Sequence, residues 1–348
     1  MRTFVHSALP QRVLFGAGTI EQVGAEVERL GASRVLLLCS PSRRIGRARD
    51  ALGSLLAAEF HGAAMHTPVE VTEQALDVVR DHDADCLVAV GGGSAVGLAK
   101  ALSVRTGLPQ IVVPTTYAGS EATPVLGETA SGEKTTRSAP EILPGTVIYD
   151  VDLTAGLPAD VSVTSGANAL AHAVEALYSA QADPITDALA LSAVAGIGRA
   201  LAGDLSDMDV RGELLESAWL AGTCLGSVGM ALHHKLCHAL GGTLGLPHAP
   251  THTVVLPHAM SYNAPAVPEV MDRIADALGA PAAPAAVYDL VVRAGGPTSL
   301  RELGMAESDI DRIAAQATAR PYPNPRELDR DGIAALLRQA WEGRRPSG

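Results

Sequence analysis

The stretch CLVAVGGGSAVGLAKALSV, residues 86–104, joins three patterns that together decide the fold. An apolar run ends at the glycine triplet Gly91-Gly92-Gly93, and a helical pattern opens just after Ser94. Glycines let the backbone approach an anion, and the N-terminus of a helix offers free N–H groups to it. The stretch therefore predicts a strand, a turn and a helix that cradle a phosphate or pyrophosphate at residues 91–94. It matches neither the GxGxxG fingerprint nor the GK[ST] ending of a P-loop.

Similar apolar runs lie on both sides of this unit, at residues 34–39, 110–113 and 146–150, with helical patterns at 21–30 and 72–81. Short apolar strands that alternate with helices are typical of parallel strands covered on both faces. Residues 1–155 are therefore expected to form an α/β domain with an open, mostly parallel sheet and helices on both faces. The polar loop PTTYAGSE, residues 114–121, is expected at the carboxyl edge, where such sheets bind ligands.

The remainder of the chain, residues 156–348, has a different character. Alanine-rich segments with helical periodicity follow one another, separated by proline and glycine breakers. They span residues 163–180, 184–201, 211–223, 267–278, 282–294, 307–319 and 331–342. This pattern predicts an all-helical second domain.

Charge and composition exclude several classes of partner. The formal net charge of -12 argues against nucleic acid and against an anionic membrane surface, because few cations would meet phosphates. We see neither a signal peptide nor a run of about 18 apolar residues, the length of a membrane span. The four cysteines are scattered, which is typical of reduced thiols in a cytoplasmic protein.

Histidines gather in one short part of the predicted helical domain. Six of the 11 lie between residues 231 and 263, namely His233, His234, His238, His248, His252 and His258. His234 and His238 share one face of a helix, as do Asn168 and His172, whereas His248 follows Pro247 in a predicted loop. Imidazoles in such a cluster bind a metal, transfer protons or hold anionic groups. An ordinary structural role is favoured for His233 and His258, and the two interpretations are balanced for His252.

These motifs, taken together, resemble the iron-containing alcohol dehydrogenase superfamily, whose fold is like that of dehydroquinate synthase. The resemblance runs from RVLFGAGT near the start to YPNPRELDRDGIAALLRQAWEG near the end. It implies that NADH or NADPH binds at the glycine loop, at the loop that follows residue 113 and at a lysine before the last sheet strand. The matching residues are Gly91, Gly92, Gly93, Ser94, Thr115, Thr116, Tyr117, Ser120 and Lys134.

The resemblance also implies a metal position, and this chain departs from it. Metal-dependent members bind iron or zinc through one aspartate and three histidines, which match Asn168, His172, His234 and His248. Asparagine thus replaces the aspartate, and Gly97 stands where GGGSxxDxAK has another aspartate. Three imidazoles and an amide form a neutral ligand set without the hard anionic oxygen that favours iron(II). A metal is therefore not expected to be required.

The departures look like the maleylacetate reductase branch of the superfamily. That branch uses NADH or NADPH to reduce the carbon–carbon double bond of maleylacetate to 3-oxoadipate during bacterial degradation of aromatic compounds. The resemblance implies a small anionic dicarboxylate as substrate, a homodimer, and an active site in the cleft between the domains. The expected catalytic residues are His234, His238, His248, Lys235, His172, Asn168 and His252. We expect imidazoles to donate to the developing enolate, with one acting as general acid.

The sequence leaves two questions open, namely whether the cofactor is NADH or NADPH and which reaction the protein catalyses. Ser40 occupies the end of a strand where NAD-preferring relatives carry an aspartate, and Arg43 and Arg44 follow, so NADPH is expected to be tolerated beside NADH. A metal-dependent alcohol or polyol dehydrogenase of the same fold stays open, as does a reductase of another oxo or unsaturated dicarboxylate. A non-redox lyase like dehydroquinate synthase and a nucleotide-binding protein without turnover are disfavoured by Asn168 and by the histidines, respectively.

Overall fold

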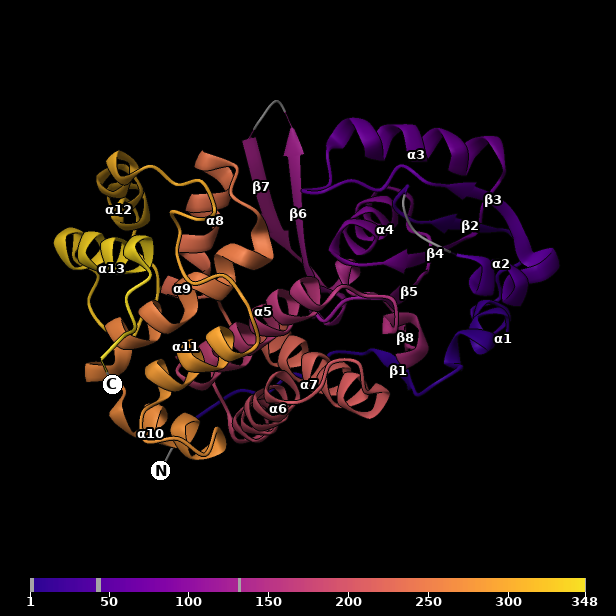
Figure 1. Ribbon diagram of the computed structural model, residues 1–348. Helices are drawn as coiled ribbons and strands as arrows, with labels where there is room; N and C mark the ends of the chain where they lie inside the picture. The colour runs from indigo at the N-terminus through magenta and orange to yellow at the C-terminus, as the bar shows by residue number, and fades with distance from the viewer. Residues whose placement is uncertain (1–2, 42–44, 131–132, 348) are drawn as a thin grey trace. The chain divides into compact units, whose positions relative to one another are not determined.

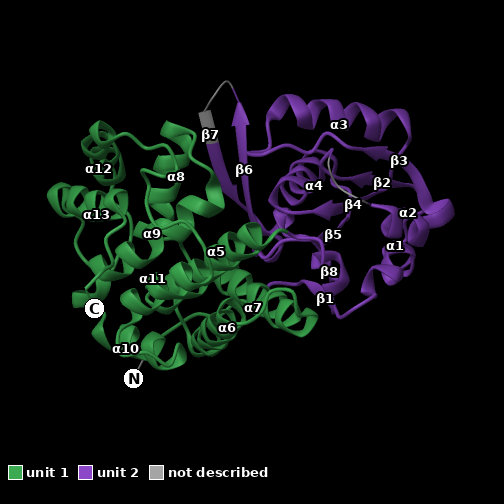
Figure 2. Cartoon of the chain, viewed as in Figure 1, with its two compact units in different colours: residues 1–7, 158–348 green, residues 8–157 purple. Residues whose placement is uncertain are grey.

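The computed structural model describes residues 3–41, 45–130 and 133–347, and the side chains of residues 133 and 134 lie outside it. The chain divides into two compact units (Figure 2), one formed by Ala8–Leu157 and the other by Pro158–Gly348 together with Met1–Ser7. The boundary lies two residues beyond the expected one. The start of the chain was expected in the first domain, but it belongs with the helical unit. His6 Nδ1 lies 2.9 Å from Asp183 Oδ2 there.

The α/β unit is built on a six-stranded sheet with the order β1-β8-β5-β4-β2-β3 (Figure 1). All neighbouring strands are parallel, as predicted. The strands are β1 (Arg12–Phe15), β2 (Val35–Leu38), β3 (Leu56–Phe60), β4 (Cys86–Gly91), β5 (Gln110–Pro114) and β8 (Thr146–Tyr149). Four of them correspond to the predicted apolar runs, whereas β1 and β3, which lie at the two edges of the sheet, were not predicted.

Helices cover both faces of this sheet, because alternate strand residues point to opposite sides. Leu37 and Val88 pack with α1 (Val23–Arg29) and α2 (Gly46–Leu52) in one apolar cluster. Leu36, Leu87 and Val112 pack in the other, with α3 (Val69–Asp81) and α4 (Gly93–Thr106). Two further strands, β6 (Val125–Ala130) and β7 (Glu133–Ser138), form an antiparallel hairpin that sequence analysis did not find. The predicted class of this domain is thus confirmed.

The second unit is helical, as expected. Its helices are α5 (Ala159–Leu177), α6 (Pro184–Ala202), α7 (Met208–Ser227), α8 (Leu232–Leu244), α9 (His248–Asn263), α10 (Pro268–Ala277), α11 (Ala283–Arg293), α12 (Ile310–Thr318) and α13 (Arg330–Glu342). Each predicted segment corresponds to one of them within a few residues. Asp183 caps α6 by accepting from the N–H groups of Ile185 and Thr186 at 2.8 and 2.9 Å, and Pro184 occupies the first helical position.

Two features of these helices differ from the expectations. His248 is not in a loop but is the first residue of α9, a helix that continues past an internal proline, Pro257. The helix α6 is long and apolar enough to cross a membrane by length and composition, although we saw no such segment in the sequence. It packs against α5 and α7, and the buried core helices of globular proteins pass the same test.

Candidate active site

The glycine loop and the loop after β5 meet at the carboxyl edge of the sheet. Gly91 ends β4, and its carbonyl accepts the N–H of Thr115 at 3.0 Å. A Cβ added at Gly92 would lie 2.9 Å from Thr116 Cγ2, so only glycine allows this approach. Gly93 and Ser94 open α4, a helix of 14 residues whose first N–H groups are available to an anion. These positions fit a pyrophosphate cradle.

A buried lysine that sequence analysis missed holds the second of these loops. Lys100 Nζ donates to the carbonyl oxygens of Ser120, Thr123 and Val125 at 2.6, 2.8 and 2.9 Å. Beside it, the hydroxyl of Tyr149 donates to Glu121 Oε1 at 3.0 Å. Burial lowers the pKa of Lys100 to about 7, and the Glu121 carboxylate opposes that shift. A lysine within an otherwise apolar helical run, GLAKAL, was the available signal.

Of the other residues expected to bind the cofactor, the structure describes only some. Ser40 follows β2 and is half-buried, and Tyr117 is buried in the loop after β5. The side chain of Lys134 and all of Arg43 and Arg44 lie outside the described residues. Gly97 has a local explanation, because a Cβ there would lie 2.3 Å from Thr67 Oγ1. An aspartate at this position would require Thr67 to move.

The helical unit gathers imidazoles from three helices. Asn168 and His172 lie on α5, His234 on α8 and His248 and His252 on α9. The ring of His234 stacks on that of His172 with centroids 5.2 Å apart and lies 5.1 Å from that of His252. His248 is exposed, and its ring lies 4.3 Å from that of His252.

The remaining predicted residues divide into two groups. The ring of His238 lies 6.4 Å from that of His234 and extends the cluster, and His233 belongs to it too, with its ring 4.8 Å from that of His252. Lys235 is exposed instead, and its Nζ lies 5.6 Å from the centre of the Tyr322 ring. The helix therefore turns Lys235 away from the face of its neighbour His234, as the angle between successive helical residues requires.

A carboxylate behind the cluster was missed. Glu175 is fully buried on α5, and its Oε2 lies 2.7 Å from His234 Nδ1. The same carboxylate accepts the backbone N–H groups of Ala231 and His233 at 2.9 and 2.8 Å. It thereby holds an N–H on Nδ1 of His234 and aims Nε2 elsewhere. Asn168, His172 and Glu175 follow a spacing of four and then three, which places them on one helical face and could have revealed the role.

Several buried ring nitrogens of the cluster are available to hydrogen-bond a ligand. His172 Nδ1, His234 Nε2 and His252 Nε2 are buried and have no hydrogen-bond partner among the residues that the structure describes. Buried polar atoms normally have partners, so these three indicate a bound molecule or water. Burial, assisted by the neighbouring imidazoles, holds the pKa of His172 and His252 well below the usual value. Both rings are therefore neutral near pH 7 and act as hydrogen-bonding groups, not as cations.

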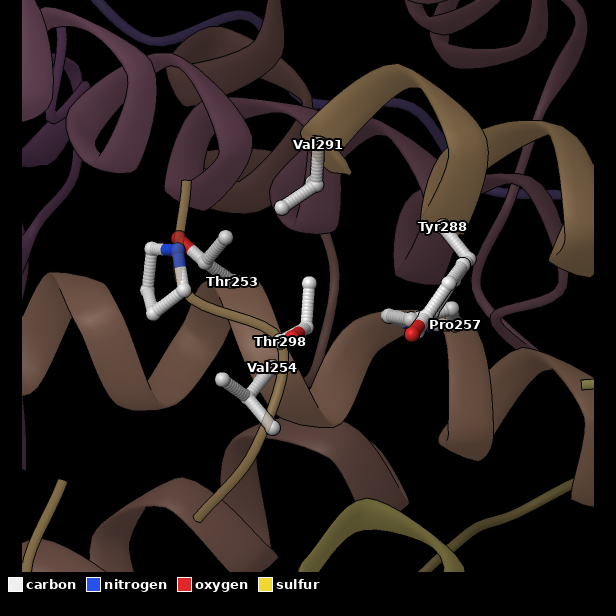
Figure 3. A pocket seen from close by; sticks show the side chains of 7 residues that line it. Thr253, Val254, Pro257, Tyr288, Val291 and Thr298 are labelled. Carbon is white, nitrogen blue, oxygen red and sulfur yellow. The ribbon is translucent and has the colours of Figure 1, made fainter. Parts of the chain in front are cut away.

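Two hollows in the helical unit lie apart from this chemistry. One is lined by Thr253, Val254, Pro257, Tyr288, Val291, Pro297 and Thr298 (Figure 3). The other, of about 430 Å³, lies beside the end of α6 and contains Arg211 and Arg293. Neither is lined by a histidine. The expectation that the active site lies in a cleft between the two domains stays a prediction.

Comparison with known proteins agrees with this arrangement. Residues 10–151 match the family described as iron-containing alcohol dehydrogenase, and residues 162–341 match the C-terminal domain of that family. Maleylacetate reductase 1 of Rhodococcus opacus is 58% identical, over 99% of this chain and 98% of its own. Crystal structures of maleylacetate reductase from Agrobacterium tumefaciens and from Rhizobium sp. strain MTP-10005 are 48% and 49% identical. Both have a TM-score of 0.95 and cover 99% of this chain and 100% of their own. The chain is therefore an oxidoreductase and belongs to the iron-containing alcohol dehydrogenase family.

Proposed function

We propose that the protein is a maleylacetate reductase, which transfers hydride from NADH or NADPH to the double bond of maleylacetate and releases 3-oxoadipate. The buried cluster of imidazoles, combined with Asn168 at the position of the family's aspartate, carries this proposal. Relatives of nearly equal length that bear this name support it. We further propose that the protein is cytoplasmic, which the four free, buried cysteines support, and that it forms a homodimer, as the family resemblance implies.

The glycine cradle fits a dinucleotide, because a Cβ at Gly92 would fill the space against Thr116. Gly91, Gly92, Gly93 and Ser94 would hold the pyrophosphate at the start of α4. Bound NADH or NADPH supplies the hydride. The contribution of Lys100 is to hold the loop that contains Ser120 in place through its carbonyl contacts.

Substrate chemistry assigns roles to the imidazoles. Hydride addition to the double bond of maleylacetate moves an electron pair onto the ketone oxygen and creates an enolate. We assign His172 and His252 as neutral donors to substrate oxygens, because each has a buried ring nitrogen that no described residue occupies. Protonated His234 would give its Nε2 proton to the carbon next to the ketone, and solvent would restore it. The Glu175 carboxylate, 2.7 Å from Nδ1, holds the ring in position for this transfer and would stabilise positive charge on it.

The family's metal position does not fit iron in this chain. Asn168 offers an amide oxygen where a carboxylate would supply negative charge, and the three matching histidines are neutral when they bind a metal. The step described above therefore uses no metal. We propose that iron at this position is not required for turnover.

Consumption of NADH or NADPH, followed by absorbance with freshly generated maleylacetate and with a panel of alcohols and aldehydes, tests the function. We expect rapid consumption with maleylacetate and little turnover of the panel. His248→Ala and His238→Ala should each lower kcat if the cluster is catalytic. Faster turnover of a simple alcohol, abolished by a chelator, would establish a metal-dependent alcohol dehydrogenase instead.

A further inference from the structure

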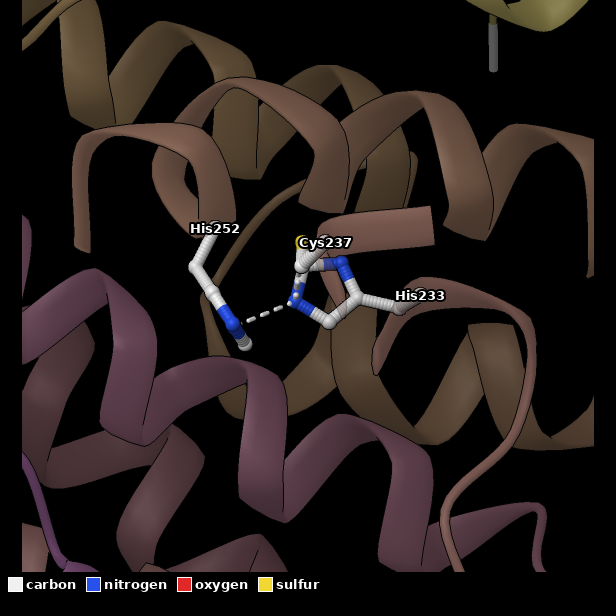
Figure 4. Close-up of side chains that lie close together, drawn as sticks. All are labelled: His233, Cys237 and His252. Atoms are coloured by element: carbon white, nitrogen blue, oxygen red, sulfur yellow. Dashed lines mark hydrogen bonds between the residues drawn. The ribbon is translucent and has the colours of Figure 1, made fainter. Parts of the chain in front are cut away.

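A second group of ligand atoms lies within the imidazole cluster, beside the family's metal position. His233 and Cys237 are four residues apart on α8, and His252 lies on the neighbouring α9 (Figure 4). His233 Nε2, Cys237 Sγ and a ring nitrogen of His252 all lie within 4.8 Å of one another. The exposed fractions of these residues are 0%, 2% and 0%. Two imidazoles and one thiol thus converge in a dry interior.

We propose that His233, Cys237 and His252 bind one zinc ion or a cation of similar softness. Zinc takes nitrogen ligands at about 2.0–2.1 Å and sulfur at about 2.3 Å with tetrahedral angles, so its ligand atoms lie about 3.4 Å apart for two nitrogens and about 3.6 Å for nitrogen and sulfur. The observed distances are 3.0 Å from His233 Nε2 to His252 Nδ1 and 3.8 Å from His233 Nε2 to Cys237 Sγ. Shifts of a few tenths of an ångström would bring these two pairs to tetrahedral distances, and Cys237 and His252, whose ligand atoms lie within 4.8 Å of each other, would have to approach to complete three sides of the coordination shell.

The ligand atoms of this group include one that becomes an anion on binding zinc, which the family's position in this chain lacks. Zinc would bind the Cys237 thiolate, whose proton leaves to solvent as the zinc–sulfur bond forms. Glu175 is buried nearby and accepts the backbone N–H of His233 at 2.8 Å. The thiolate offsets one of the two positive charges of zinc directly, and the Glu175 carboxylate, which also contacts His234 at 2.7 Å, adds a further negative charge in a region where an unbalanced charge would be costly. Asn168, His172, His234 and His248 include no anion.

Ligand softness also selects the metal. A thiolate with two imidazoles favours zinc over iron(II), magnesium or calcium, which prefer harder oxygen ligands. Three protein ligands leave the fourth position open to water or to another group. Coordination through Nδ1 of His252 would fix the N–H on its Nε2 and so make that nitrogen a hydrogen-bond donor. The ion would then orient an imidazole of the active site without requiring contact with the substrate.

Cobalt(II) substitution tests the site with a readout other than activity, and it does not depend on the proposed substrate. Cells grown in zinc-depleted medium with cobalt supply the metal during folding, which the burial of the site requires. A thiolate bound to cobalt produces a near-ultraviolet charge-transfer band, whereas cobalt bound only by nitrogen and oxygen at Asn168, His172, His234 and His248 does not. We expect the wild-type protein, purified without chelator, to retain one cobalt per chain and to show the band.

Matched variants locate the ligand. Cys237→Ser should abolish the band and lower the retained cobalt by at least about 10-fold, a loss no smaller than that caused by removing an outer-shell partner. Cys224→Ser, at a buried cysteine whose Sγ lies 3.6 Å from the Thr186 carbonyl, should keep both. The proposal is overturned if the wild-type protein retains no cobalt, if it retains cobalt without the band, or if the band persists in Cys237→Ser. The wild-type spectrum decides the matter even if Cys237→Ser fails to fold.

Discussion

Glu175→Gln tests the idea that a buried carboxylate orients the imidazole of His234 and the residues around it. The carboxylate accepts three hydrogen bonds, two at Oε2 from Ala231 N–H and His234 Nδ1 and one at Oε1 from His233 N–H. A glutamine has one acceptor oxygen. In its better orientation it keeps the two bonds at Oε2 and places its amide group against the N–H of His233 at a distance of 2.8 Å.

The number of hydrogen bonds lost gives the expected size of the effect on stability. One bond to a charged acceptor is lost and one buried donor is left unsatisfied, which should lower the free energy of unfolding by about 2–3 kcal/mol. The charge partner of His234 is lost as well, and outer-shell partners of this kind typically contribute about 10–100-fold to activity. We therefore expect kcat with maleylacetate to fall by that factor. The KM for NADH should change little, because the glycine cradle contains none of these groups.

Denaturant unfolding and steady-state kinetics measure the two effects, and Asp183→Ala separates them. Asp183 is also buried, but it caps α6 and contacts no residue of the cluster. Its loss removes the cap and the contact with His6, which should cost about 1–2 kcal/mol of stability and leave kcat unchanged. If Glu175→Gln keeps kcat within about twofold of the wild type, or if Asp183→Ala loses kcat to the same degree, the role assigned to Glu175 is wrong.

Three further predictions concern other buried groups. Asn168→Asp returns a carboxylate to the family's metal position, so the purified variant should retain more iron or zinc per chain than the wild type, as metal analysis of both would show; an unchanged metal content would contradict the charge argument. Lys100→Met removes the donor that holds three loop carbonyls, so the variant should melt at a lower temperature and show a higher KM for NADH; an unchanged KM would limit Lys100 to stability. His258 is buried with a pKa lowered to about 4 by desolvation, so the folded state resists the proton that the unfolded state accepts near pH 6.5. The lowered pKa of His258 therefore contributes to the free energy of unfolding above pH 6.5. That contribution, about 3 kcal/mol in total, is lost as the pH falls from 6.5 toward 4. Plots of the free energy of unfolding against pH for the wild type and for His258→Gln should therefore converge as the pH falls from 6.5 toward 4. Parallel plots would refute the lowered pKa of His258.

Some elements could be predicted because their local sequence is unambiguous. The central strands β4 and β5 are apolar on both faces and end at glycine or proline, and α6 begins with Asp183 and Pro184. The strands that were missed are of another kind. The edge strand β3 is only half-buried, and β7, EKTTRS, is polar, so neither has the apolar run that identifies a central strand. Similarly, Pro247 suggested a loop at His248, although a proline just before a helix is equally compatible with its start.

The sequence by itself determined the central strands and the helices that alternate with them, the glycine turn before α4 and the helical spacing that places Asn168 on the same face as His172. These are local properties, set by periodicity and backbone sterics over a few residues. Only the tertiary structure decided which side chains meet: Glu175 with His234 across 59 residues, and His233 with His252 across 19. Such contacts depend on how α5, α8 and α9 pack, and helical spacing fixes the face of a residue but not its partner on another helix.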